Sequence, residues 1–166
     1  MRRTYHRCLV LATLALIVGG CGSTKGSHKP LPQPARHIQV TLPWPDGGTI
    51  PRRYTCSGAG VAPRVEAQRI AGEHDQAIVM TDPDAPGGTF VHWTKWGAGQ
   101  GRNSFGGTGY GPPCPPRGDK PHRYVVTVYA LRRRLQLAPG ASPDSVLAAV
   151  RKDALASGST TGLYGR

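Results

Sequence analysis

Four side chains that can bind or transfer a proton lie in one stretch of the chain, between positions 81 and 124. Asp82 directly follows the apolar run Ala77–Thr81, and His92 lies within a second apolar run. His122 and Tyr124 are two residues apart, so in an extended strand they point to the same face. A carboxylate that holds one nitrogen of an imidazole keeps the ring protonated, and the other nitrogen can then donate to an oxyanion. This combination predicts a small anion pocket.

Two glycines complete the predicted pocket. Gly109 and Gly111 carry no Cβ, so a ligand can approach closely, and backbone N–H groups at such positions can face an anion. The proline-rich loop 112–116 that follows is expected to be stiff. We therefore predict the following ligand-binding residues: Asp82, His92, Gly109, Gly111, His122 and Tyr124.

The elements that must position these groups are mostly strands. Tyr124–Leu131 is rich in β-branched and aromatic residues, and Ala77–Thr81 and Phe90–Trp96 are apolar runs typical of buried strands. His37–Leu42 alternates as a half-buried strand does, and 49–55 is a candidate for a short strand. The chain has 23 Gly and 16 Pro, which disfavours long helices.

One small helix is expected near the C-terminus. Ser142 is a good N-cap, and Pro143 and Asp144 suit the first turn. We expect this helix to stop near Gly158, with 162–166 as a tail that could return to the sheet. The prediction is a mainly β fold of antiparallel strands with a small C-terminal helix.

The N-terminus has the pattern of an export signal. Arginines precede a twelve-residue apolar run, which is too short to span a bilayer and typical of a secretory signal. Val18–Cys21 resembles the lipobox of bacterial lipoproteins. We predict a signal peptide over 1–20, lipidation at Cys21, a flexible tether over 21–34 and a folded domain over 35–166. The predicted location is the extracytoplasmic face of a bacterial membrane.

Cleavage of this signal leaves two cysteines for the folded domain. Cys8 leaves with the signal and Cys21 carries the lipid, so Cys56 and Cys114 remain in an oxidising compartment. We favour a disulfide between them, with two free buried thiols as the alternative.

The chain is basic, with a formal net charge of +12. An exported protein meets little nucleic acid, and the only dense run, Arg132–Arg134, is typical of a solvated strand end. We therefore expect no nucleic-acid partner. Attraction to anionic lipid headgroups is the better use of the charge.

The ordered motifs D-P-D-A-P at 82–86, H-W at 92–93 and G-Y-G-P-P-C-P-P through H-R-Y at 109–124 resemble the phosphatidylethanolamine-binding protein family. The similarity is closest to its bacterial, Raf-kinase-inhibitor-like branch and covers roughly 38–166. The resemblance implies two packed antiparallel sheets and a cavity for phosphate-bearing groups, lined by the six residues named above. The segment 94–108 is shorter than is usual in the family, so a more open cavity is expected.

The expected function is non-enzymatic binding of phosphate-bearing small molecules or phospholipid headgroups at the membrane, without a cofactor. One alternative is an inhibitor or interaction module that acts on an envelope enzyme, as family members do with kinases and proteases. Another is a metal-dependent hydrolase that uses Asp82, His92 and His122 as ligands. The chain has no H-E-x-x-H motif, so we expect these side chains to be pocket walls and not metal ligands.

Overall fold

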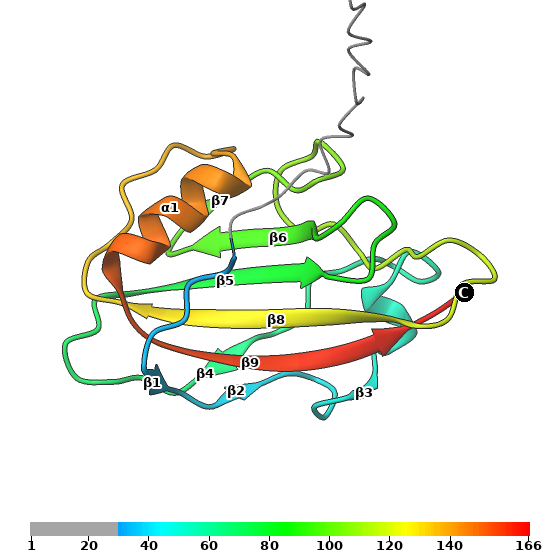
Figure 1. Ribbon diagram of the computed structural model, residues 1–166, viewed down its shortest axis with the longest axis horizontal. Coiled ribbons are helices and arrows are strands. Elements are labelled where there is room, and N and C mark those ends of the chain that lie inside the picture. The colour runs from blue at the N-terminus through cyan, green and yellow to red at the C-terminus, as the bar shows by residue number, and fades with distance from the viewer. Residues whose placement is uncertain (1–29) are drawn as a thin grey trace, which may run out of the picture.

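The computed structural model describes residues 30–166, which form a mainly β domain with one α-helix (Figure 1). The elements in chain order are β1 (Arg36–His37), β2 (Val40–Thr41), β3 (Gly48–Thr49), a 3₁₀ helix (Arg52–Tyr54), β4 (Glu66–Ala67), β5 (Asp75–Asp82), β6 (Phe90–Trp96), β7 (Gly99–Gln100), β8 (His122–Leu131), α1 (Pro143–Asp153) and β9 (Ala154–Tyr164).

A seven-stranded sheet dominates the domain. Its order is β1-β9-β8-β5-β6-β7, with β3 also paired to β9, and β2 and β4 form a second, two-stranded sheet. The long pairings are antiparallel, as predicted, whereas the short strands β1 and β3 lie parallel to β9. Strands β5, β6 and β8 confirm the three strands predicted from apolar runs.

Both faces of the large sheet are covered, which explains why its central strands are almost continuously apolar. On one face α1 packs through Val146, Leu147 and Val150 against Val79 and Tyr129. On the other face, the segments before β5 bring further apolar side chains onto the sheet, among them Leu42, Trp44, Ile50 and Tyr54 against Met80 and Val126. The two clusters together hold β5 and β8 in place.

The C-terminal region differs from the prediction. The N-cap is correct, because the Ser142 hydroxyl accepts a hydrogen bond from Ser145 N–H, but the helix ends at Asp153. Gly158 lies within β9, which pairs with β8 over almost its whole length. The helix is thus followed directly by a long strand, and the expected tail is the end of that strand.

The N-terminal half also differs in detail. The strand expected over 37–42 is divided into β1 and β2, and the one expected over 49–55 is instead β3 followed by a 3₁₀ turn. The predicted signal peptide, Cys21 and most of the tether lie outside the described residues. Within those residues, the carbonyl of Pro30 accepts a hydrogen bond from Arg151, and Leu31 packs against the cluster beneath α1. No helix of this described part is long and apolar enough to cross a membrane.

Candidate anion-binding site

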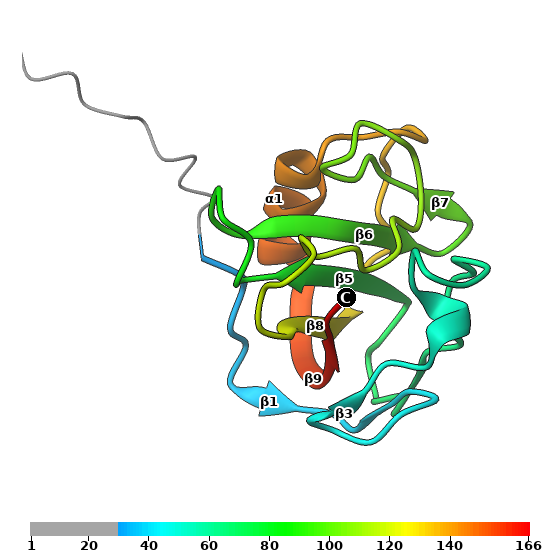
Figure 2. The ribbon, with the colours of Figure 1, turned by 90° about the vertical axis from the view of Figure 1, so that its right-hand side faces the viewer.

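The site begins where β5 ends and β8 starts, at the end of the sheet that faces the viewer in Figure 2. Along β8 the side chains of His122 and Tyr124 are buried and that of Arg123 is exposed, which confirms the predicted alternation. Nδ1 of His122 lies 2.7 Å from Oδ2 of Asp82. Both side chains are almost fully buried, so little water screens the interaction between them.

His92 reaches the same place through an irregularity in β6. Met80 pairs with Trp93 and Thr81 with Val91, so His92 has no direct partner in β5. Such a bulge re-aims a side chain and is common beside functional sites. Burial lowers the pKa of His92 below its usual 6.5, and its Nδ1 lies 2.9 Å from the carbonyl oxygen of Gly111. The neutral ring therefore donates through Nδ1 and presents Nε2 as an acceptor.

The two glycines do not present free amides. Gly109 N–H donates to the carbonyl of Gly101 at 2.9 Å, and Gly111 N–H donates to that of His92 at 2.7 Å. The physical reason is that this segment covers the open edge of β6, whose backbone groups need partners. Gly111 instead fixes His92 from both sides, since its carbonyl also receives Nδ1–H. The expectation that free N–H groups of Gly109 and Gly111 face a bound anion is therefore wrong for this geometry.

The other four predicted residues line one cavity of about 140 Å³. Asp82, His92, His122 and Tyr124 all contribute to its wall, and each is at most 4% exposed. Sequence reasoning missed the apolar part of the wall. This part consists of Ala85, Pro86, Phe90, Phe105, Pro115 and Pro116, beside Cys114. The aromatic residues gave no signal, because Phe90 fits a buried strand and Phe105 lies in a polar loop.

Phe105 forms the outer lip of the cavity. Its side chain is 55% exposed, and its ring centroid lies 4.7 Å from that of Phe90 and 5.3 Å from that of His92. The buried Asn103 fixes this loop, because its Oδ1 accepts hydrogen bonds from the N–H groups of Phe105 and Gly107. A large apolar side chain is thus held partly in water at the mouth of the site.

Tyr124 is the least satisfied group in this wall. It is fully buried, and its hydroxyl makes no hydrogen bond of ordinary geometry with the described residues, although the Asp82 carboxylate and the backbone N–H of Cys114 lie near it. Burial raises the pKa of Tyr124 well above its usual value, and the charge of Asp82 acts in the same direction. The phenol therefore stays protonated and keeps a donor available for a bound group.

A second carboxylate, Asp84, is neutralised outside the cavity. Arg123 donates to it through Nε at 2.9 Å and through an Nη at 2.7 Å, and its backbone N–H also reaches Oδ2. These contacts hold the pKa of Asp84 far below its usual range. The pair ties the turn after β5 to the start of β8 and thereby supports the Asp82–His122 contact.

The acidic and imidazole groups do not form a metal site in this geometry. Asp82, His92 and His122 share the cavity, but no group of three or more His, Cys, Asp or Glu side chains within residues 30–166 converges as metal ligands do. The arrangement instead offers a hydroxyl donor, a paired imidazole and an acceptor nitrogen around a small space.

The predicted disulfide is present and belongs to this wall. Cys56 and Cys114 are bonded, which closes a loop of 58 residues. Cys56 N–H also donates to the carbonyl of Pro113 at 3.0 Å, so the 3₁₀ turn and the proline-rich loop are joined twice. The bond fixes one side of the cavity.

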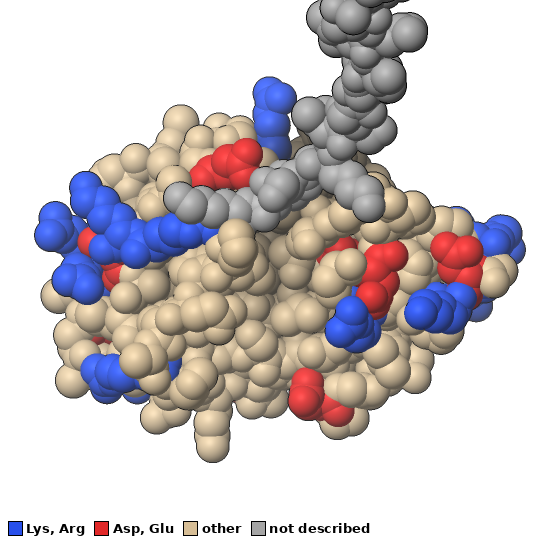
Figure 3. Space-filling view, in the orientation of Figure 1, with Lys and Arg blue, Asp and Glu red and all other residues tan. Residues whose placement is uncertain are grey.

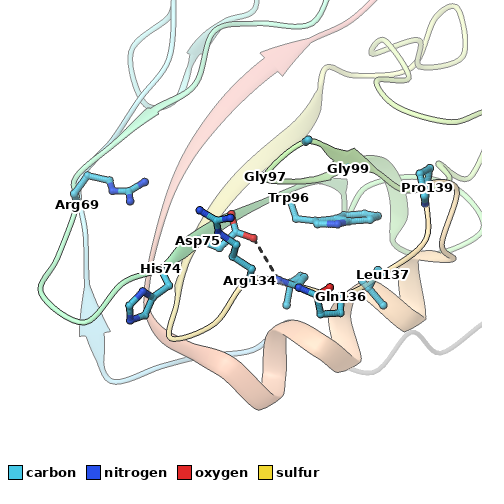
Figure 4. A pocket seen from close by; sticks show the side chains of 12 residues that line it. Arg69, His74, Asp75, Trp96, Gly97, Gly99, Arg134, Gln136, Leu137 and Pro139 are labelled. Atoms are coloured by element: carbon cyan, nitrogen blue, oxygen red, sulfur yellow. Dashed lines mark hydrogen bonds between the residues drawn. The ribbon is translucent and has the colours of Figure 1, made fainter.

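A larger hollow of about 620 Å³ lies at the opposite end of β5 (Figure 4). Its charged groups are engaged in the fold or exposed. Asp75 accepts backbone N–H groups from Gln76 and Leu135, and Arg69 pairs with the buried Glu73. None of its lining residues carries a buried polar atom without a partner. We therefore place the candidate site in the smaller cavity.

Comparison with known proteins defines the class. A family model described as phosphatidylethanolamine-binding protein matches residues 41–165, and the chain belongs to that family. Two crystal structures have the same fold. CT736 of Chlamydia trachomatis, described as a homologue of phosphatidylethanolamine-binding proteins, superposes with a TM-score of 0.73 at 28% identity, covering 80% of this chain and 99% of that one. Escherichia coli YbcL gives 0.70 at 27% identity, covering 78% and 99%.

Two sequence relatives extend this result. A Pyrococcus horikoshii protein, UPF0098 protein PH1269, is 34% identical over 95% of this chain and 88% of its own length. A Mycobacterium tuberculosis protein named "Putative lipoprotein LppC" is 37% identical over 86% of this chain and 88% of its own length. The chain is thus similar both to an archaeal family member and to one named as a lipoprotein.

Proposed function

We propose that this protein is a non-enzymatic binding domain for phosphate-bearing groups, phospholipid headgroups among them. The observation that carries the proposal is the buried Tyr124 hydroxyl in the cavity wall, which makes no hydrogen bond of ordinary geometry within the described residues. A buried polar group without a hydrogen bond costs about 1–3 kcal/mol, and a bound oxyanion would satisfy it. His122, held by Asp82 through Nδ1, supplies a second donor through Nε2 when its ring is protonated.

The composition of the wall supports binding without chemistry. Among the residues that line the cavity, the one cysteine, Cys114, is held in the disulfide and cannot act as a thiolate nucleophile. His92 donates through Nδ1 to Gly111 and keeps Nε2 as an acceptor, which suits a hydroxyl or ammonium hydrogen of a ligand. The cavity therefore offers complementary hydrogen bonds and no activated nucleophile.

Calorimetric titration of the full-length protein with phosphoethanolamine and with inorganic phosphate tests this function. We expect saturable binding of at least one, and a loss of about tenfold or more in affinity for His122→Ala, because a charge-assisted hydrogen bond is removed. His37→Ala, at an exposed histidine in β1, is the matched control and should bind as wild type does. Absence of heat with both of these ligands and with the phosphodiester dimethyl phosphate would refute the proposal.

We further propose that a lipid on Cys21 anchors the domain to the membrane. The relative named as a lipoprotein and the lipobox-like sequence at 18–21 support this. Several acyl chains on one residue give stable anchoring, because each buried CH₂ contributes about 0.8 kcal/mol. Expression in a bacterium with lipoprotein processing should place wild type in the membrane fraction and Cys21→Ala in the soluble fraction. Equal partitioning of the two would contradict the anchor.

A further inference from the structure

We propose that Asp119 makes the cavity selective for singly charged phosphodiesters over doubly charged phosphomonoesters. This inference rests on the proposed function, since it concerns the same cavity. Asp119 lies in the loop before β8 with its side chain 44% exposed, and its Oδ2 is 3.7 Å from Nε2 of His122. Nε2 is the nitrogen of His122 that Asp82 leaves open, so an incoming oxyanion and the Asp119 carboxylate meet at one donor.

The cavity itself carries no positive charge that could compensate a dianion. Among the described residues that line it there is neither Lys nor Arg. Asp82 is hydrogen-bonded to His122 and can offset a positive charge there, and burial keeps His92 neutral by lowering its pKa. The side chains that line the cavity therefore supply no net positive charge, and Asp119 adds a negative charge beside Nε2 of His122. One negative charge on the ligand can be bound through hydrogen bonds, whereas a second negative charge finds no positively charged side chain in the cavity wall.

The other cations near the cavity do not line it, because Arg117 and Lys120 are exposed in the loop of Asp119 and Arg166 donates to the carbonyl of Pro115 on the outside. Arg123, the nearest arginine on β8, is already paired with Asp84. The exposed run Arg132–Arg134 follows the other end of β8, about 30 Å from His122 at 3.3 Å per strand residue. Figure 3 shows one group of Lys and Arg at the left-hand end, where β8 ends, and further basic residues beside acidic ones at the right-hand end. At physiological ionic strength the Debye length is about 8 Å, so this run contributes little at the cavity.

The apolar wall favours an ester for a second reason. Phe90, Phe105, Pro86 and Pro115 line the space around the polar groups. The alkyl group of an ester, which is joined to phosphorus through oxygen, would contact these surfaces and be removed from water, which is favourable. A free phosphate presents only oxygens to the same surfaces and leaves some of them without hydrogen bonds.

The test compares two probes that differ in one charge, at pH 7.5 and by calorimetry on the full-length protein. Dimethyl phosphate carries one negative charge, and methyl phosphate carries mostly two, because its second pKa is about 6. We expect wild type to bind dimethyl phosphate more tightly. In Asp119→Asn the affinity for methyl phosphate should rise about fivefold more than that for dimethyl phosphate. Glu66→Gln is the control, since it makes the same change in net charge at the exposed β4.

The outcomes separate this inference from the function on which it rests. An unchanged preference in Asp119→Asn, with dimethyl phosphate still bound, would overturn the role of Asp119 and leave phosphate binding intact. A wild-type preference for methyl phosphate would also overturn it. Failure of both esters to bind any variant would refute the proposed function and this inference together.

Discussion

Asp82 and His122 are joined by a 2.7 Å hydrogen bond although 40 positions separate them in the sequence. The contact exists because β5 ends at one residue, β8 begins at the other, and the two strands pair antiparallel. Neither side chain is more than 5% exposed, so the pair is withdrawn from water. The same contact therefore stabilises the sheet and fixes the imidazole that faces the cavity.

Replacing one partner of this pair should affect both stability and binding. We expect Asp82→Asn to lower the free energy of unfolding by about 2 kcal/mol, because a buried hydrogen bond to a charged group is weakened. Asp84→Asn is the control, since its partially exposed pair with Arg123 should be worth less than about 1 kcal/mol. Urea denaturation measures both values. Equal losses in the two variants would show that the buried pair has no special role.

Stability should fall on mild acidification because of His92. Burial depresses the pKa of this imidazole in the folded state, so below the unfolded pKa of 6.5 the unfolded chain binds a proton that the native protein does not. The stability contribution is thus present above pH 6.5 and is lost as the pH falls. We expect a loss of at most about 2 kcal/mol by pH 5, the limit set by the unfolded pKa, and this loss should be absent in His92→Gln. Urea titrations at several pH values measure it, and parallel curves for the two proteins would argue against this cause.

The disulfide should contribute strongly to stability. Closing a loop of 58 residues is worth about 4 kcal/mol in the chain-entropy estimate. We expect the double variant Cys56→Ala/Cys114→Ala to lose about that much and also to bind phosphoethanolamine more weakly, since Cys114 lines the cavity. Denaturation and calorimetry measure the two effects. A loss below about 1 kcal/mol would mean that the loop is constrained by other contacts.

The central strands, and the convergence of four of the six predicted residues on one cavity, could be predicted because the local pattern agrees with the tertiary structure. In β8 the alternation places His122 and Tyr124 inward, and apolar runs identify β5 and β6 because both faces of the sheet are covered. The resemblance of the ordered motifs to the family predicted the rest, namely that β5, β6 and β8 converge at one cavity.

The last strand could not be predicted in this way. β9 has the sequence ALASGSTTGLY, whose small residues have low β-propensity and suggested a helix stop and a tail. The residues of β9 are small for a steric reason. A Cβ at Gly158 would collide with the carbonyl of Ile38, and one at Gly162 with Ile50 and Trp44. The small residues mark a strand on which other segments lie closely.

The contacts that Asp119 and Phe105 make at the cavity could not be predicted from the sequence either. Asp119 lies in an exposed loop and Phe105 among Gly, Ser and Asn residues, and neither position has a periodic pattern. Gly109 and Gly111 misled for the opposite reason. Glycine at these positions suits an anion site. The N–H of Gly111, however, donates to His92 at the open edge of β6, and that of Gly109 donates to Gly101.

The central claim is that the Tyr124 hydroxyl, which makes no hydrogen bond of ordinary geometry within the described residues, binds the ligand. Tyr124→Phe tests it most directly, because stability and affinity should change in different directions. We predict a free energy of unfolding equal to or above that of wild type, since an unsatisfied buried group is removed. Affinity for dimethyl phosphate in calorimetric titration should fall about tenfold. Unchanged affinity in a variant that folds normally would contradict the account.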